Sequence, residues 1–155
     1  MRAHFTGKGC MTATELVILV DENDREIGSA EKLHAHRENL RHRAFSIFIL
    51  RNKANPEILL QQRAAEKYHS ANLWTNTCCS HPRPGEDLLL AGQRRLKEEL
   101  GFSVPLTSLG WFHYIAHFEN GLAANEMGGA MHAESEGVGR GATMILEIPY
   151  HIPKQ

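Results

Sequence analysis

The stretch TNTCCSHPRPGEDLLLAGQRRLKEELGF, residues 75–102, decides the fold and carries the residues on which a functional interpretation depends. Its first half places two cysteines and a histidine in a polar loop. Its second half predicts a helix over residues 87–100, because Asp87 brings negative charge to the helix start and Gly101 is a common C-terminal stop. Leucines recur at helical spacing, so we expect one face of this helix to pack on a sheet.

Two interpretations of the helix remain open from its residue types. Glu98 and Glu99 are hard oxygen ligands that suit Mg²⁺, and Arg94 lies one turn from Glu98, where it can orient the carboxylate. For RRLKEEL alone, a solvated helix with ordinary ion pairs is the simpler explanation. The spaced Glu86 ahead of the helix and the closing Gly101 favour the metal-binding interpretation.

Length and composition indicate a single globular domain. The chain has 155 residues, of which 42% are hydrophobic and 23% are charged, and its net charge is −1. Such a charge gives no reason to expect a nucleic-acid partner. No apolar run approaches the ~18 residues of a membrane span.

The cysteines and the N-terminal residues suggest a cytoplasmic protein. Cys10, Cys78 and Cys79 are an odd number with one adjacent pair, which is a poor disulfide framework. We therefore expect reduced thiols and a cytoplasmic location. Residues 1–10 lack the apolar centre of a signal peptide, and we expect them to be a poorly ordered extension.

Short apolar runs between turn residues predict an α+β domain with one mixed or antiparallel sheet. Residues 32–43 are polar and rich in histidine, and we expect a loop or a short helical turn. Residues 128–142 contain five glycines with little periodicity, and we expect loop or disorder. The expected strands cover residues 16–20, 27–30, 44–50, 57–62, 73–77, 109–118 and, in the tail, 144–148.

The helix and the loop before it resemble the Nudix box, which reads Gly, five residues, Glu, seven residues, then Arg-Glu-aliphatic-x-Glu-Glu-x-Gly-aliphatic. Two positions depart from the pattern: Ser80 stands in place of the Gly, and Arg95 stands in place of the Glu after Arg. The resemblance implies a Nudix-like mixed sheet flanked by helices, with a C-terminal part that is truncated or diverged. The matching positions are Glu86, Arg94, Leu96, Glu98, Glu99, Gly101 and Phe102.

Arg95 distinguishes this chain from the Nudix hydrolases it resembles. A hydrolase usually has a metal-binding Glu at this position, whereas an Arg binds phosphate and does not hold metal. The chain resembles in this respect the type I isopentenyl-diphosphate isomerases. The resemblance implies an isomerase domain over residues 11–127, followed by an atypical glycine-rich tail over residues 128–155. The segments that carry it are EKLHAH (31–36), HRAFSIFIL (42–50), LLQQRAAEK (59–67), LWTNTCCSHP (73–82), HYIAHF (113–118) and NEM (125–127).

The same resemblance implies roles for individual residues. Cys79, Glu126 and Tyr114 are the implied catalytic residues. Cys78 is then a small packed neighbour, and Trp74 is expected in the core. The implied ligand sets are His36, His42, His81 and Glu126 for a divalent metal (Mn²⁺, Mg²⁺ or Zn²⁺), Glu99 for Mg²⁺, and Lys32, Arg63, Lys67 and Arg95 for a diphosphate.

The implied reaction is the isomerisation of isopentenyl diphosphate to dimethylallyl diphosphate, with a small-molecule substrate and no nucleic-acid or membrane partner. One group protonates the alkene, and a second group on the other side removes a different proton. Two alternatives stay open: a Nudix diphosphate hydrolase, and a metal- or diphosphate-binding relative that has lost catalysis. The second is favoured by the tail and by Ala124, which stands where the isomerases carry a further metal-binding Glu.

Overall fold

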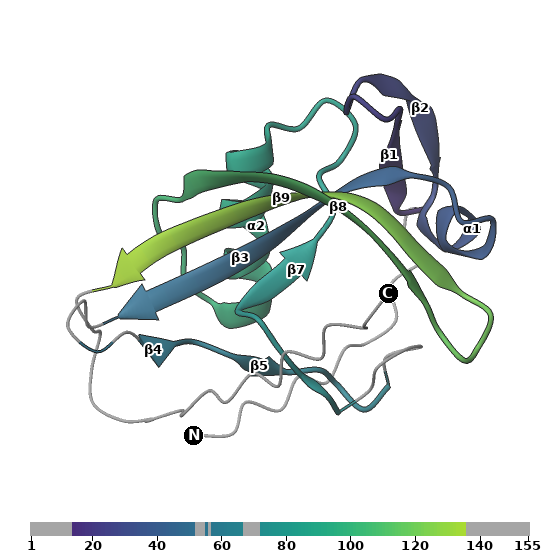
Figure 1. Ribbon diagram of the computed structural model, residues 1–155. Coiled ribbons are helices and arrows are strands. Elements are labelled where there is room, and N and C mark those ends of the chain that lie inside the picture. The colour runs from purple at the N-terminus through teal and green to yellow at the C-terminus, as the bar shows by residue number, and fades with distance from the viewer. Residues whose placement is uncertain (1–13, 52–54, 56, 67–71, 136–155) are drawn as a thin grey trace.

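The computed structural model describes residues 14–51, 55, 57–66 and 72–135, with side chains up to residue 133. These residues form one long mixed sheet and a second, two-stranded sheet that lies beside it (Figure 1). The elements are β1 (Leu16–Val20), β2 (Glu26–Glu31), α1 (Lys32–Arg37), β3 (His42–Arg51), β4 (Glu57–Ile58), β5 (Gln61–Gln62), β6 (Trp74–Thr75), β7 (Cys78–Ser80), α2 (Leu88–Leu100), β8 (Thr107–His117) and β9 (Ala123–Ser135).

The sheet has the order β2-β1-β3-β9-β8, and β4 and β7 also pair with β3. Strands β3 and β9 run parallel, with His42 opposite Glu126 and Arg51 opposite Ser135. The other strand pairs are antiparallel. The prediction of an α+β domain with a mixed sheet is therefore confirmed.

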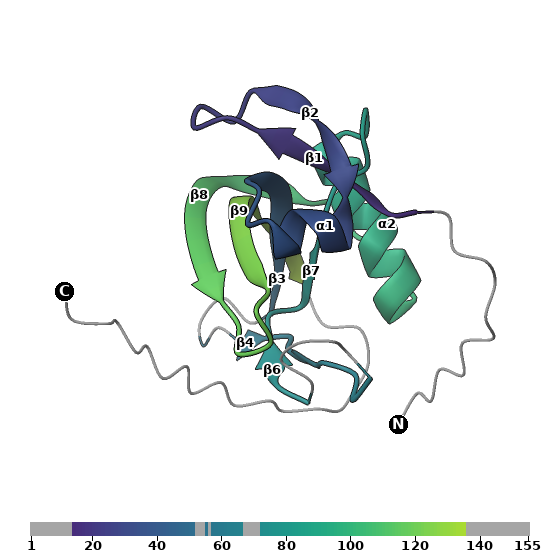
Figure 2. The same cartoon turned by 90° about the vertical axis from the view of Figure 1, so that its right-hand side faces the viewer.

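Helix α2 forms where the sequence predicts it, because both of its ends are capped. The carboxylate of Asp87 accepts hydrogen bonds from the backbone N–H groups of Leu89 and Leu90 at 3.0 Å. At the other end Gly101 adopts φ 80°, the left-handed conformation that a glycine takes without strain. The helix lies against one face of the sheet, as the two views in Figures 1 and 2 show.

The core lies between α2 and that face of the sheet. Leu96 is fully buried on the helix, and Phe45, Ile47 and Met131 are buried on the strands. Alternate residues of β3 point into this core, whereas their neighbours point to the opposite face. The face away from α2 is therefore free to carry polar side chains, such as His42 and Ser46 of β3.

The expectation of loop or disorder from residue 128 is wrong for residues 128–135, which lie in β9. The glycines that hide the strand periodicity lie where side chains of neighbouring elements pack closely against the strand. A Cβ on Gly128 would meet the Phe112 ring at 2.8 Å, and one on Gly129 would meet Leu88 at 2.6 Å. The expected strand over 144–148 and the expected extension over 1–10 lie outside the described residues.

Smaller differences concern the segments around the site. The polar segment 32–43 contains the short helix α1, and β3 begins two residues earlier than expected, at His42. The expected strand over 57–62 is split into β4 and β5. Trp74 is 57% exposed on β6, so its placement in the core was wrong, whereas the prediction that Cys78 is packed is confirmed.

Candidate active site

Three neighbouring strands place a histidine, a glutamate and a tyrosine in one row across the sheet. His42 of β3 lies opposite Glu126 of β9, and Glu126 lies opposite Tyr114 of β8. Residues that are directly opposite in a sheet point to the same face. The Tyr114 hydroxyl donates a hydrogen bond to a carboxylate oxygen of Glu126. The strand register alone therefore sets the middle of the site.

Two further histidines reach this row from α1 and from the end of β7. Strand β7 pairs with β3, and His81 follows it directly, so its ring lies 5.1 Å from that of His42, measured between centroids. The ring of His36 on α1 lies 4.8 Å from that of His42. One ligand atom from each of His36, His42, His81 and Glu126 lies within 4.8 Å of the others.

The hydrogen bonds of the histidines leave suitable nitrogens for a metal. His36 donates from Nδ1 to the carbonyl of Ala123 at 2.7 Å, and His42 donates from Nδ1 to that of Leu40 at 2.8 Å, because a carbonyl only accepts. Each Nε2 then carries the lone pair. His42 Nε2 and His81 Nδ1 are buried and have no hydrogen-bond partner within the described part of the chain.

Burial tunes the charges of this cluster toward metal binding. It lowers the pKa of His36 and of His81, which favours the neutral imidazole that binds metal. Burial alone would raise the pKa of Glu126, but nearby His81 and the hydrogen bond from the Tyr114 hydroxyl hold it well below its usual range. Three imidazoles and one carboxylate fit a divalent cation such as Zn²⁺.

Ala124 stands two residues before Glu126 on β9, lines the same cavity and is buried. Its methyl group offers no ligand atom, so β9 contributes a single carboxylate to the cluster. The departure from the isomerase pattern thus falls at the site itself.

Cys79, Tyr114 and Glu126 share a cavity of about 660 Å³ with cationic side chains. The lining includes His36, His81 and Glu99 and three of the four expected diphosphate contacts, namely Lys32, Arg63 and Arg95. Lys67, the fourth, lies outside the described residues. The structure therefore brings the predicted acid–base, metal and anion groups to one place, with His42 buried behind them.

The thiol of Cys79 faces this cavity. Although Cys79 is exposed toward the cavity, desolvation of its sulfur raises its pKa, and the Glu126 carboxylate adds to the rise, while hydrogen bonds with Ser46 and Asn76 act in the opposite direction. Burial and the neighbouring Glu126 also raise the pKa of the Tyr114 hydroxyl. Thiol and phenol are therefore both held in their protonated forms close to one carboxylate.

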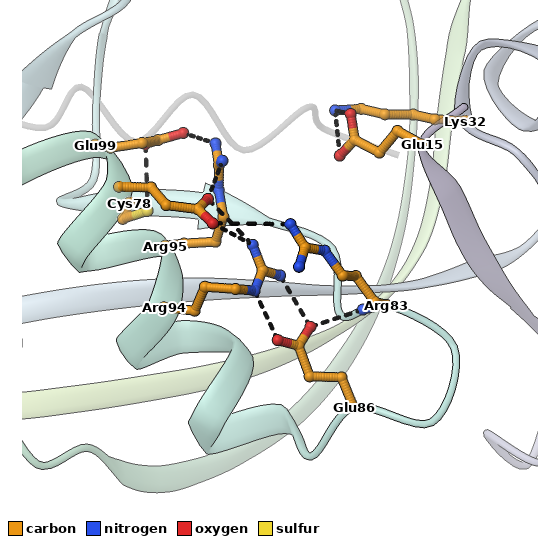
Figure 3. Close-up of polar contacts among 9 residues, drawn as sticks. Glu15, Lys32, Cys78, Arg83, Glu86, Arg94, Arg95 and Glu99 are labelled. Carbon is orange, nitrogen blue, oxygen red and sulfur yellow. Dashed lines mark hydrogen bonds and ion pairs between the residues drawn. The ribbon is translucent and has the colours of Figure 1, made fainter. Parts of the chain in front are cut away.

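The N-terminal turns of α2 are tied to the preceding loop by Arg94 (Figure 3). Its guanidinium donates to both oxygens of Glu86, at 2.6 and 2.9 Å, and to Glu98 at 3.1 and 3.2 Å. The predicted one-turn pairing of Arg94 with Glu98 is therefore present, and it orients the Glu98 carboxylate. Glu86 is held in the same way and also accepts from the backbone N–H of Arg83 at 2.9 Å.

The two carboxylates of α2 that line the cavity, Glu98 and Glu99, are bridged by Arg95. Its guanidinium donates to Glu98 at 2.7 Å and also to Glu99. The buried thiol of Cys78 donates to the second oxygen of Glu99 at 3.3 Å, and burial raises the pKa of this thiol, which keeps it protonated. Cys78 is therefore packed, as predicted, but it also contacts the expected Mg²⁺ ligand.

Lys32 reaches the cavity from the start of α1 and is held by Glu15. The ammonium group lies 3.1 and 3.2 Å from the two carboxylate oxygens (Figure 3). The backbone N–H of Lys32 also donates to the carbonyl of Glu15 at 2.9 Å. Sequence reasoning missed Glu15, Ser46 and Asn76. Asn76 lies inside the quoted motif, but its role depends on strand pairing.

Comparison with known proteins places the chain in a family. A profile described as the NUDIX domain matches residues 40–129. The chain belongs to the Nudix family. The site described above thus lies within a Nudix domain, although residues 32–36 precede the matched range.

Two curated proteins similar to this chain are named as isopentenyl-diphosphate isomerases. "Isopentenyl-diphosphate Delta-isomerase 2" of Photorhabdus laumondii is 54% identical over 112 residues, which are 72% of this chain and 62% of that protein. "Isopentenyl-diphosphate Delta-isomerase" of Serratia proteamaculans is 53% identical over 112 residues, with the same coverage. The chain therefore spans about 62% of the length of these relatives.

A solved structure supports the fold alone. The protein DR0079 of Deinococcus radiodurans superposes with a TM-score of 0.62 at 16% identity, covering 80% of this chain and 74% of that one. Within the described residues, no helix has the length and apolar character that crossing a membrane requires.

Proposed function

We propose that this Nudix domain catalyses the isomerisation of isopentenyl diphosphate to dimethylallyl diphosphate. The observation that carries the proposal is one cavity that holds Cys79, Tyr114 and Glu126 beside a cluster of imidazoles and a set of cationic side chains. The similarity to proteins named as isopentenyl-diphosphate isomerases supports it.

Lys32, Arg63 and Arg95 are proposed to bind the diphosphate, together with Lys67. Three of these cations line the cavity, and a guanidinium can bind two phosphate oxygens at once. Glu99 is proposed to hold Mg²⁺, which prefers carboxylates together with substrate phosphates. When the diphosphate binds, the Arg95 guanidinium would donate to phosphate oxygens instead of to Glu98 and Glu99.

Cys79 and Glu126 are proposed to move the two protons. Protonation of the terminal alkene carbon gives a tertiary carbocation, and removal of a proton from the neighbouring methylene gives the isomer. Tyr114 holds the Glu126 carboxylate through its hydroxyl. A divalent cation bound to His36, His42, His81 and Glu126 would supply positive charge that tunes the proton affinity of the carboxyl group.

We propose the metals and the compartment from the chemistry of the same groups. The imidazole-rich cluster suits Zn²⁺ or Mn²⁺, and Mg²⁺ suits Glu99. Both described cysteines are free thiols, which agrees with a reducing, cytoplasmic location.

The test is incubation of the metal-loaded protein with isopentenyl diphosphate, Mg²⁺ and Mn²⁺ in deuterated water. Dimethylallyl diphosphate that carries deuterium, and its loss in Cys79→Ala, is the expected result. Release of phosphate from a nucleoside diphosphate derivative without isomerisation would identify a hydrolase instead. If the folded, metal-loaded protein binds isopentenyl diphosphate but incorporates no deuterium into it, the protein is a relative that has lost catalysis, as Ala124 suggests.

A further inference from the structure

Asn76 lies in the turn between β6 and β7, three residues before Cys79. We infer that Asn76 is a positioning residue whose side-chain amide fixes the direction of the Cys79 S–H bond. The inference rests on the proposed function only in giving that thiol a catalytic role. The orientation itself follows from hydrogen bonds between described residues.

The amide of Asn76 has one possible orientation. Its Nδ2 lies 3.2 Å from the carbonyl oxygen of Ile47 and 3.2 Å from that of Cys78. Carbonyl oxygens only accept, so the NH₂ group must face them and both of its hydrogens are used. Because β7 pairs with β3, with Ile47 opposite Cys78, these two carbonyls are fixed by the main sheet.

The fixed amide then determines the direction of the Cys79 S–H bond. Asn76 Oδ1 contacts Cys79 Sγ and accepts only, so the thiol is the donor. The hydroxyl of Thr75 also donates to this oxygen, at 2.9 Å. With the thiol hydrogen directed at Asn76, the Ser46 hydroxyl, 3.6 Å from the sulfur, is the donor of that contact.

This chain of donors keeps the proton of Cys79 in one place while the sulfur faces the cavity. The side chain of Cys79 lines the cavity, whereas Asn76 is not one of the described residues that do so. Asn76 therefore acts on the substrate only through the thiol. Its loss should change the rate of the proton-transfer step much more than it changes substrate binding.

The direct test is the infrared S–H stretching band of Cys79. The band is assigned by its loss in Cys79→Ser, and Cys78→Ala assigns the second described thiol. In the wild-type protein we expect the Cys79 band at lower frequency than that of an unbonded thiol, and in Asn76→Ala we expect it to shift upward. A wild-type band already at the unbonded frequency would overturn the inference, and this outcome does not depend on whether Asn76→Ala folds.

Steady-state kinetics provide the second readout. Asn76→Ala is expected to lower kcat by roughly 10- to 100-fold, because misplacing a reacting group by ~1 Å can cost about 10²-fold, and to leave KM nearly unchanged. A rise in KM with unchanged kcat would contradict the assignment. If the wild-type protein does not turn over isopentenyl diphosphate, the proposed function fails, and the S–H band still decides the inference by itself.

Discussion

Replacing Arg94 with methionine removes the cation that ties α2 to the loop before it. The side chains of Arg94 and Glu86 are 20% and 19% exposed and share two short hydrogen bonds. Exposed ion pairs contribute ~0–1 kcal/mol, and breaking a buried pair costs ~3–5 kcal/mol. The pair is intermediate in burial and bidentate, so we expect a coupling energy of about 1–2 kcal/mol between Arg94 and Glu86.

A double-mutant cycle measures this coupling. The four proteins are the wild type, Arg94→Met, Glu86→Gln and the double variant, unfolded by urea in a chelator so that metal binding does not add to stability. Glu98, the second partner of Arg94, is present in all four, which separates the two contacts. A coupling energy below about 0.5 kcal/mol would refute the argument that this pair anchors the helix.

The pair Arg83–Glu98 is the matched control. Its atoms lie 3.8 Å apart and the Arg83 side chain is 65% exposed. An exposed pair at this distance should show a coupling of less than about 0.5 kcal/mol in a cycle of Arg83→Met with Glu98→Gln. A coupling as large as that of Arg94 with Glu86 would mean that burial does not distinguish the two pairs.

The pH dependence of the first cycle has a definite sign. The hydrogen bond from Arg94 lowers the pKa of Glu86 in the folded protein. The stabilisation from this shift is fully present above the unfolded pKa of about 4.3 and is lost as the pH falls through the lower folded pKa. The difference in unfolding free energy between wild type and Arg94→Met should therefore shrink below about pH 4.

Further predictions address the metal cluster, the core and β9. His36→Ala should weaken Zn²⁺ or Mn²⁺ binding, measured calorimetrically, by more than about tenfold. Losing even a residue that only hydrogen-bonds to a metal ligand costs roughly 10–100-fold in affinity. The control is His34→Ala, at an exposed position on the same helix, which should leave the affinity unchanged. Leu96→Ala should cost ~2–5 kcal/mol in urea unfolding, because the side chain is fully buried. Gly128→Ala should cost about 0.5–1.5 kcal/mol in the same assay by displacing the Phe112 ring from its stack on Tyr114. Unchanged stability in either of the last two would contradict the packing described.

Local chemistry made some elements predictable and hid others. Helix α2 was predictable because Asp87 and Gly101 mark its two ends within the sequence. Strand β9 was not, because its glycines look like loop residues until Phe112 and Leu88 are seen to fill the space above them. Propensity describes a residue by itself, and this strand is formed by what packs against it.

The site, too, has residues that could be predicted from the sequence and residues that could not. The resemblance supplied His36, His42, His81 and Glu126, and the structure brings them together. The resemblance supplied no role for Asn76 or Glu15. Asn76 bonds to a backbone carbonyl of β3, and Glu15 accepts from Lys32, which is distant in sequence, so both contacts depend on tertiary structure. Trp74 was misplaced because a large aromatic side chain is usually buried, whereas β6 lies outside the main sheet.

The parallel pairing of β3 with β9 has a kinetic consequence. Strand β3 ends at Arg51 and β9 begins only at Ala123, and the two strands must meet before Glu126 reaches His42. Closing so long a loop is entropically unfavourable and slow compared with forming α2 or the β1–β2 hairpin. We therefore expect the cluster to assemble late during folding, so that a chain interrupted in refolding holds its helix and hairpin but binds no metal at this cluster.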